Sequence, residues 1–131
     1  MPVNGTYKYE KGENIEGFLV AIGVKEDKAK ELASITDRTV TLNYTGEKLE
    51  VETKGKETIK NTLTIGSPST FVFGTGFEIE VTLSVSGNVG KGVIKKGDRK
   101  GEITIEYSDP GTLTETFNVD GNTAKRIYKK V

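Results

Sequence analysis

From Arg38 to its last residue, the chain carries turn signals at short and regular intervals. The signals combine Gly with Asp, Asn, Ser, Thr or Pro and separate runs rich in Val, Ile, Thr and Phe; after Gly46 and Gly55 they are Gly66-Ser67-Pro68, Gly74-Thr75-Gly76, Ser86-Gly87-Asn88, Gly97-Asp98, Asp109-Pro110-Gly111 and Asp120-Gly121. Asp-Gly and Gly-Asn are good hairpin connectors, because they tolerate positive φ. A spacing of roughly eight to twelve residues between turns is typical of an antiparallel sandwich or barrel. Counting the runs predicts nine strands in this part of the chain.

The segment before Arg38 has a helical pattern. One apolar stripe at positions i, i+3, i+4 and i+7 consists of Ile15, Phe18, Leu19 and Ile22. Asn14 is expected to be the N-cap of this helix, and Gly23 is expected to end it. A second short helix is expected over roughly Glu26 to Ser34, with inward-facing residues Ala29, Leu32 and Ala33.

The expected order is one strand at residues 5–11, two short helices and nine further strands in an up-and-down meander. The last strand can pair with the first around Tyr7 and close the sheet, which removes exposed edges. Ten strands enclose more space than the filled interior of a small eight-stranded barrel. Aromatic residues make up only 8% of the chain and Trp is absent, so we expect a cavity. We predict a mainly β protein, a ten-stranded antiparallel barrel with a helix-turn-helix cap between strands 1 and 2, in a single domain of residues 1–131.

Composition argues against several classes of function. Lys plus Arg number 19 and Asp plus Glu number 19, so the net charge is zero, and we expect no nucleic-acid partner. The chain has no Cys and no His, which removes thiolate chemistry, the commonest general base and the commonest metal ligand. No Gly-x-Ser-x-Gly elbow and no phosphate-binding loop occur. We therefore expect no enzymatic activity, no cofactor and no metal site.

The sequence also bears on the compartment. No apolar run reaches the ~18 residues of a membrane span, and the first residues lack the basic and apolar regions of a secretory signal. The absence of Cys fits a reducing compartment. We therefore expect a soluble, cytoplasmic protein.

Three stretches, taken in order, resemble the intracellular lipid-binding proteins, which include the fatty-acid-binding and cellular retinoid-binding proteins. These stretches are GTYKYEKGENIEGFLVAIGV near the N-terminus, IKNT at residues 59–62 and AKRIYKKV at the C-terminus. The cap spacing GVKEDKAKEL is similar to that of invertebrate members. The resemblance covers the whole chain and implies a ten-stranded β-clam that carries long-chain fatty acids, or similar hydrophobic ligands, noncovalently in the cytoplasm. We also expect a monomer.

Arg126 and Tyr128 are the main candidate ligand residues. Strand alternation puts them on one face of the last strand and Ile127 on the other. Alternation alone does not decide which face is inward, because lysines flank Ile127. The resemblance implies that Arg126 and Tyr128 point inward and hold the ligand carboxylate.

The chain departs from the family pattern at the position of a second inward Arg. Counting back from Tyr128 without gaps places Glu106 there, where it could neutralise Arg126 and favour a neutral or hydroxylated lipid such as a retinoid. A shift by one residue would instead bring Ile103, Ile105 and Tyr107 inside. In either register the second cation is expected to be missing. The apolar gate residue, Phe in many members, is Ile59 here.

The remaining candidate ligand contacts are aromatic and aliphatic wall residues, namely Phe18, Tyr44, Leu49, Val51, Ile59, Phe71, Phe73 and Phe117. Lys25, Lys28 and Lys30 of the cap could contact an anionic membrane transiently, or they could form an ordinary solvated helix face. The alternative function is a lipocalin-like or purely structural β-barrel module.

Overall fold

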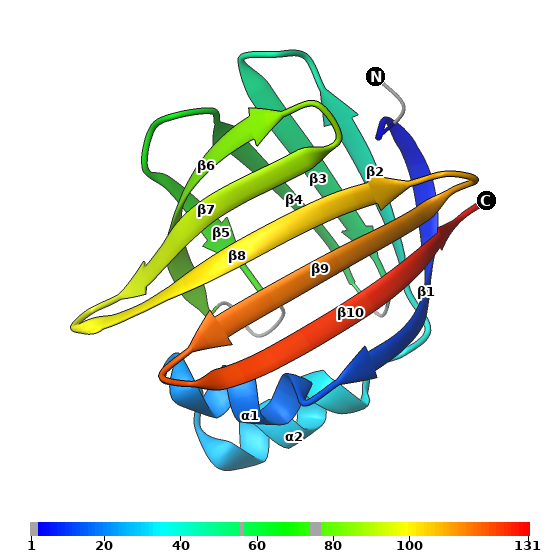
Figure 1. Ribbon diagram of the computed structural model, residues 1–131. Helices are drawn as coiled ribbons and strands as arrows, with labels where there is room; N and C mark the ends of the chain where they lie inside the picture. Colours follow the sequence, from blue (N-terminus) through cyan, green and yellow to red (C-terminus); the bar gives the residue numbers. More distant parts are fainter. Residues whose placement is uncertain (1–2, 56, 74–76) are drawn as a thin grey trace.

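The computed structural model describes residues 3–55, 57–73 and 77–131, and its strands form one antiparallel sheet that curls into a barrel (Figure 1). The strands are β1 (Gly5–Glu13), β2 (Thr39–Tyr44), β3 (Lys48–Lys54), β4 (Thr58–Thr64), β5 (Ser69–Val72), β6 (Glu78–Ser86), β7 (Val89–Lys96), β8 (Arg99–Ser108), β9 (Thr112–Val119) and β10 (Asn122–Lys130). Two helices, α1 (Ile15–Ala21) and α2 (Glu26–Ser34), lie between β1 and β2. This arrangement confirms the predicted fold class. The predicted turn at residues 74–76 lies outside the described residues.

The first and last strands pair, as the sequence predicted. Tyr7 lies opposite Lys130 and Tyr9 lies opposite Tyr128, with a register irregularity between Tyr9 and Lys11. This pairing joins the two halves of the meander into a ten-stranded sheet with the order β4-β3-β2-β1-β10-β9-β8-β7-β6-β5. The sheet therefore has only two edges, β4 and β5, and these meet where the barrel closes.

Side chains rather than a backbone ladder join the two edges. The backbone N–H of Thr64 on β4 donates to the Ser69 hydroxyl on β5 over 2.9 Å. Asn61 on β4 is buried and bonds to the backbone of Val72 on β5. The edge groups are thus partly satisfied without a continuous sheet, so this seam differs from the other strand pairs.

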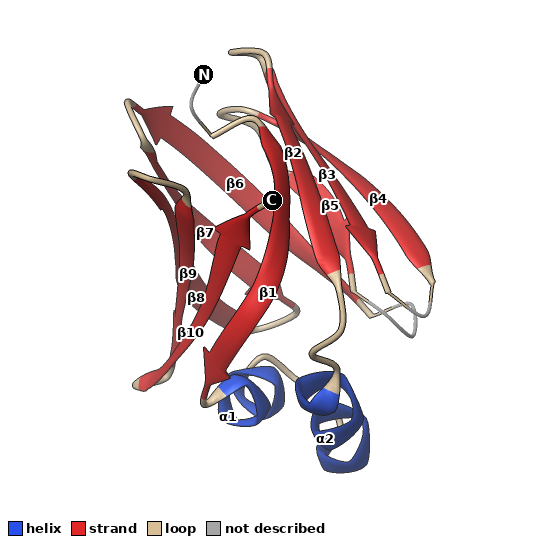
Figure 2. Cartoon of the chain, turned by 90° about the vertical axis from the view of Figure 1, so that its right-hand side faces the viewer, coloured by secondary structure: helices blue, strands red, loops and turns tan. Residues whose placement is uncertain are grey.

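The helices cover one end of the barrel (Figure 2). The predicted apolar stripe of Ile15, Phe18, Leu19 and Ile22 is buried, and α1 packs against β9, β10 and α2. Of the residues of α2 that were predicted to face inward, Ala29 and Leu32 are buried and Ala33 is half-buried. Gly23 has φ +113° and follows the helix end, as expected. Arg99, at the start of β8, donates from Nη1 to the carbonyl of Ala21 over 2.8 Å and ties the end of α1 to the sheet.

Asn14 is the N-cap residue of α1, as predicted, but its side chain does not cap the helix. Asn14 directly precedes α1, but its backbone is left-handed, with φ 52° and ψ 31°, and its side chain makes no capping hydrogen bond. Instead, its Nδ2 donates to the carbonyl of Thr123 over 3.0 Å. The side chain is therefore used to join the cap to the start of β10, a contact between distant parts of the chain.

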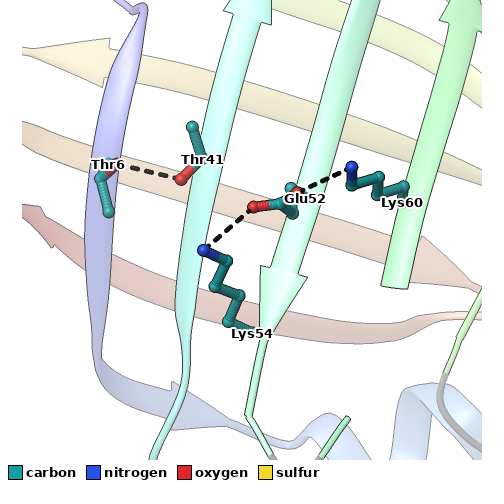
Figure 3. Close-up of polar contacts among 5 residues, drawn as sticks. All are labelled: Thr6, Thr41, Glu52, Lys54 and Lys60. Atoms are coloured by element: carbon teal, nitrogen blue, oxygen red, sulfur yellow. Dashed lines mark hydrogen bonds and ion pairs between the residues drawn. The ribbon is translucent and has the colours of Figure 1, made fainter. Parts of the chain in front are cut away.

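The outward face of the sheet is polar. The hydroxyls of Thr6 and Thr41 lie 2.9 Å apart across β1 and β2, and Glu52 forms ion pairs with Lys54 and Lys60, each over 3.4 Å (Figure 3). Such cross-strand pairs stabilise a sheet modestly. The opposite face carries the apolar residues, so the core and the candidate site lie inside the barrel. No helix in the described part of the chain is long and apolar enough to cross a membrane.

Candidate ligand-binding site

The barrel encloses a cavity between its apolar strand faces. The volume of this cavity is about 60 Å³. Strands β2, β3, β6, β8 and β9 each contribute two or more of its apolar walls, and β4 and β5 contribute one each. The apolar lining residues are Val40, Leu42, Leu49, Val51, Leu63, Phe71, Phe73, Ile79, Val81, Leu83, Ile103, Ile105, Leu113 and Phe117. The polar lining residues are Arg38, Thr53, Glu115, Arg126 and Tyr128. The cavity is therefore mostly apolar and contains a small cluster of charged groups.

Arg126 faces this interior. It is 8% exposed, Tyr128 two residues further on is 2% exposed, and both line the cavity. Ile127 between them is only half-buried and lies on the opposite face of β10. The antiparallel ladder to β9 fixes this orientation, because it pairs Arg126 with Glu115 and Tyr128 with Leu113.

The expectation that the cavity lacks a second cation is wrong, because Arg38 supplies one. Arg38 directly precedes β2, and its carbonyl accepts a hydrogen bond from the backbone N–H of Tyr9 over 3.1 Å. Its guanidinium carbon lies 5.2 Å from the centre of the Tyr9 ring. Arg38 lies in a loop with no strand alternation to read, so nothing in the sequence pattern marked it as inward.

The inward placement of Glu106 is also wrong. Glu106 is exposed, whereas Ile103 and Ile105 line the cavity and Tyr107 is buried. The apolar residues of β8 take the inner face, because burying them is favourable and burying an unpaired carboxylate is costly. The register shifted by one residue is therefore the one that forms.

The carboxylate inside the cavity belongs to Glu115 on β9. Glu115 shares its strand face with Leu113 and Phe117, which are both buried. This period-two pattern was visible in the sequence and could have identified Glu115 as an inward residue. Glu115 lies directly opposite Arg126 in the ladder, yet no ion pair joins it to either arginine within the described ranges.

Burial and charge shift the pKa values in this cluster. Burial lowers the pKa of Arg38, and repulsion by Arg126 lowers it further. Burial also acts to lower the pKa of Arg126, but the interactions with Tyr128 and Glu115 outweigh it and raise that pKa. Burial and the negative charge of Glu115 raise the pKa of Tyr128 to about 12. At neutral pH the cluster therefore holds two guanidinium cations and a neutral phenol that can donate a hydrogen bond.

Phe117 connects the cavity to the cap. Its ring stacks on that of Phe18 with centroids 4.4 Å apart and an interplanar angle of 23°, and the guanidinium carbon of Arg126 lies 5.6 Å from its centre. Phe18 is fully buried but does not line the cavity, so its role is to pack α1 against the barrel. Ile59 is half-buried on the strand face that it shares with Asn61 and Leu63, and it does not line the cavity either.

The other expected wall residues divide in the same way. Leu49, Val51, Phe71 and Phe73 line the main cavity, whereas Tyr44 lines a smaller pocket with Leu83 and Val85. No group of His, Cys, Asp or Glu within the described residues could hold a metal ion. An apolar chamber with two arginines and a phenol can bind an elongated apolar molecule that carries an acidic group.

The fold and the cavity thus define a class of protein, a lidded β-clam with an internal site for a hydrophobic ligand. No protein-family model matches the chain. Among curated proteins, a fatty acid-binding protein of Tyrophagus putrescentiae is 31% identical over 136 residues, which cover 98% of this chain and 97% of the relative. The intestinal fatty acid-binding protein of Homo sapiens is 30% identical over 132 residues, which cover 99% of each chain.

Solved structures agree with these relatives. The fatty-acid-binding protein of Manduca sexta matches with a TM-score of 0.83 and 25% identity over 98% of this chain and 99% of the other. A Schistosoma mansoni fatty acid binding protein in complex with arachidonic acid matches with a TM-score of 0.86 and 20% identity over 99% and 96% of the two chains. The chain belongs to the fatty acid-binding protein family.

Proposed function

We propose that this protein carries long-chain fatty acids noncovalently inside its barrel. The observation that carries the proposal is the pair of inward arginines, Arg126 and Arg38, at the wall of an apolar cavity. The acyl chain would lie among the aliphatic and aromatic walls. The carboxylate would accept hydrogen bonds from the two guanidinium groups and from the hydroxyl of Tyr128.

Electrostatics favour an acid over a neutral ligand. Arg126 is close enough to Arg38 to disfavour its charge, and the carboxylate of Glu115 balances only one of the two guanidinium groups. A buried charge without a partner is costly. A fatty-acid carboxylate would neutralise the remaining positive charge, whereas a retinol-like or other neutral ligand would leave it uncompensated.

We also propose a single domain of residues 1–131 that works as a cytoplasmic monomer without catalytic activity or a cofactor. The one curled sheet supports the single domain, and the relatives are named as binding proteins rather than as enzymes. Transient membrane contact through the cap is a further proposal. Lys28 and Lys30 are engaged with Glu31 and Glu26 on the surface of α2, over 3.5 Å and 3.9 Å, so membrane contact would rely more on Lys25 and on Val20, which is 41% exposed.

Calorimetry on delipidated protein tests the proposed function. Hexadecanoic acid is expected to bind at about one molecule per chain and more tightly than hexadecanol, because only the acid has a carboxylate for the arginines. Organic extraction of the freshly purified protein followed by mass spectrometry is expected to show co-purified fatty acid. A protein that binds neither hexadecanoic acid nor hexadecanol would rule out the carrier function.

A further inference from the structure

Three buried polar atoms in the cavity cluster have no hydrogen-bond partner among the described residues. They are Nε of Arg38, Nε of Arg126 and Oε1 of Glu115. The two nitrogens are donors and the carboxylate oxygen is an acceptor. Since an unsatisfied buried polar group is costly, the arrangement is suited to a ligand that offers acceptors and a donor together.

The positions of the three side chains determine which groups of a ligand could satisfy them. A ligand carboxylate provides acceptors for Arg38 and Arg126 but offers no donor to Glu115. It would also bring a second negative charge close to the first, because Glu115 lies directly opposite Arg126 on the neighbouring strand. An unsubstituted fatty acid therefore satisfies the arginines and leaves Glu115 both unpaired and repelled.

We infer that the preferred ligand is a long-chain fatty acid with a hydroxyl group close to its carboxylate. The inference rests on the proposed function and specifies the ligand class of the same site. The carboxylate would bind the guanidinium groups of Arg38 and Arg126, and the hydroxyl would donate to Oε1 of Glu115. The two guanidinium groups and the carboxylate of Glu115 together carry one positive charge, which a single monocarboxylate neutralises.

The ladder also limits where the hydroxyl can be. Directly opposed residues in an antiparallel pair have Cβ atoms about 4.5–5.5 Å apart. Arg126 and Glu115 would therefore bind groups that lie close together on one ligand. A hydroxyl on carbon 2 or carbon 3 meets this requirement. A hydroxyl at the far end of the acyl chain would lie among apolar walls such as Leu49 and Val81, where its burial is unfavourable.

The test compares four ligands of equal length by calorimetry on the delipidated full chain. They are hexadecanoic acid and its 2-hydroxy, 3-hydroxy and 16-hydroxy derivatives. The variants are Glu115→Leu and, as a matched control, Glu106→Leu, which makes the same change at an exposed position of the adjacent strand β8. Circular dichroism and thermal melts establish that each variant folds.

For the wild type we expect the 2-hydroxy or the 3-hydroxy acid to bind roughly tenfold to a hundredfold more tightly than hexadecanoic acid, as one hydrogen bond to a charged group implies. The 16-hydroxy acid should bind no more tightly than hexadecanoic acid. Glu115→Leu should remove the preference and strengthen the binding of hexadecanoic acid, whereas Glu106→Leu should change neither.

Each failure has a separate signature. If none of the four acids binds the wild type, the proposed function itself is wrong. If hexadecanoic acid binds but neither proximal hydroxyl improves its affinity, or if the preference survives Glu115→Leu, the inference about hydroxy acids is wrong. Should Glu115→Leu fail to fold, the wild-type comparison of proximal and 16-hydroxy acids still decides, because equal affinities overturn the inference.

Discussion

Asn61 on β4 binds the backbone of Val72 on β5 through both ends of its side-chain amide. Its Nδ2 donates to the carbonyl of Val72 over 3.0 Å, and its Oδ1 accepts from the N–H of Val72 over 2.8 Å. The amide thus takes the place of a neighbouring strand at the seam between the two sheet edges. Asn61 is 6% exposed, so these bonds form away from water and help to hold the barrel closed.

Replacing Asn61 with Ala should therefore loosen the seam. Two backbone groups of Val72 lose their partner, and we expect a loss of about 1–3 kcal/mol in the free energy of unfolding. Hydrogen exchange at the amide of Val72 should accelerate, and ligand release measured by stopped flow should become faster. Thr62→Ala, at an exposed position on the other face of β4, is the control. Unchanged protection of the Val72 amide would show that Asn61 does not hold the seam.

Replacing Arg126 with Leu should weaken the binding of a fatty acid but not that of the corresponding alcohol. The loss of hydrogen bonds to a charged group should reduce the affinity for hexadecanoic acid roughly tenfold to a hundredfold and barely alter that for hexadecanol. Hexadecanol is the control ligand, because it has no carboxylate for the arginine. Equal losses for the acid and the alcohol would mean that Arg126 does not bind the carboxylate.

Arg38→Leu should show the same selectivity for the acid over the alcohol. Arg38 and Arg126 bind one carboxylate in the proposed site, so the double variant should lose less than the two single losses combined. Calorimetry on the wild type, the two single variants and the double variant measures this coupling. Glu106→Gln, on the outer face of β8, is the control and should bind like the wild type. Fully additive losses would mean that the two arginines do not share the ligand carboxylate.

Phe18→Ala should detach the cap from the barrel. The stacked contact between Phe18 and Phe117 is lost together with a fully buried side chain, and we expect a destabilisation of about 3–5 kcal/mol. Association and dissociation of the ligand should both accelerate as the cap opens. Val20→Ala on the same helix, at a position that is 41% exposed, should leave both rates and the melting temperature almost unchanged. Equal ligand exchange in the two variants would exclude entry beneath α1.

Alkaline pH should destabilise the fold through Tyr128. Its pKa rises from 10.0 to about 12 on folding because burial disfavours the phenolate. Below pH 10 the phenol is neutral in both states, so its contribution of about 3 kcal/mol is complete. Above pH 10 the unfolded chain loses the proton first, and the contribution disappears as the pH rises towards 12.

The measurement is the free energy of unfolding in denaturant between pH 9 and pH 12, with phenolate absorbance as an independent reading. Tyr128→Phe should make the free energy of unfolding fall less steeply with pH. It should also remove one phenol that titrates above the ordinary range from the absorbance curve. Part of the decline should persist, because burial also raises the pKa of Tyr7 to about 12. An unchanged slope in Tyr128→Phe would mean that this phenol titrates normally in the folded protein.

The sequence alone determined the elements and their order. Strand alternation, turn residues and the helical stripe of Ile15, Phe18, Leu19 and Ile22 are local signals, and local signals specify which segments become strands and helices. The pairing of the first and last strands also followed, because an up-and-down sheet of ten strands has few other ways to cover its edges.

Tertiary structure alone decided which charges meet inside the barrel. Glu106 and Glu115 are both carboxylates on adjacent strands, and only the register that buries Ile103 and Ile105 sends Glu106 outward while Glu115 stays inside. Arg38 reaches the cavity from the loop before β2. A loop has no alternation of inward and outward residues, so the sequence pattern could not predict its orientation. Asn14 meets Thr123 across more than a hundred residues. A residue pattern encodes which way a side chain points along its own strand, but the curl and register of the closed sheet determine what it meets there.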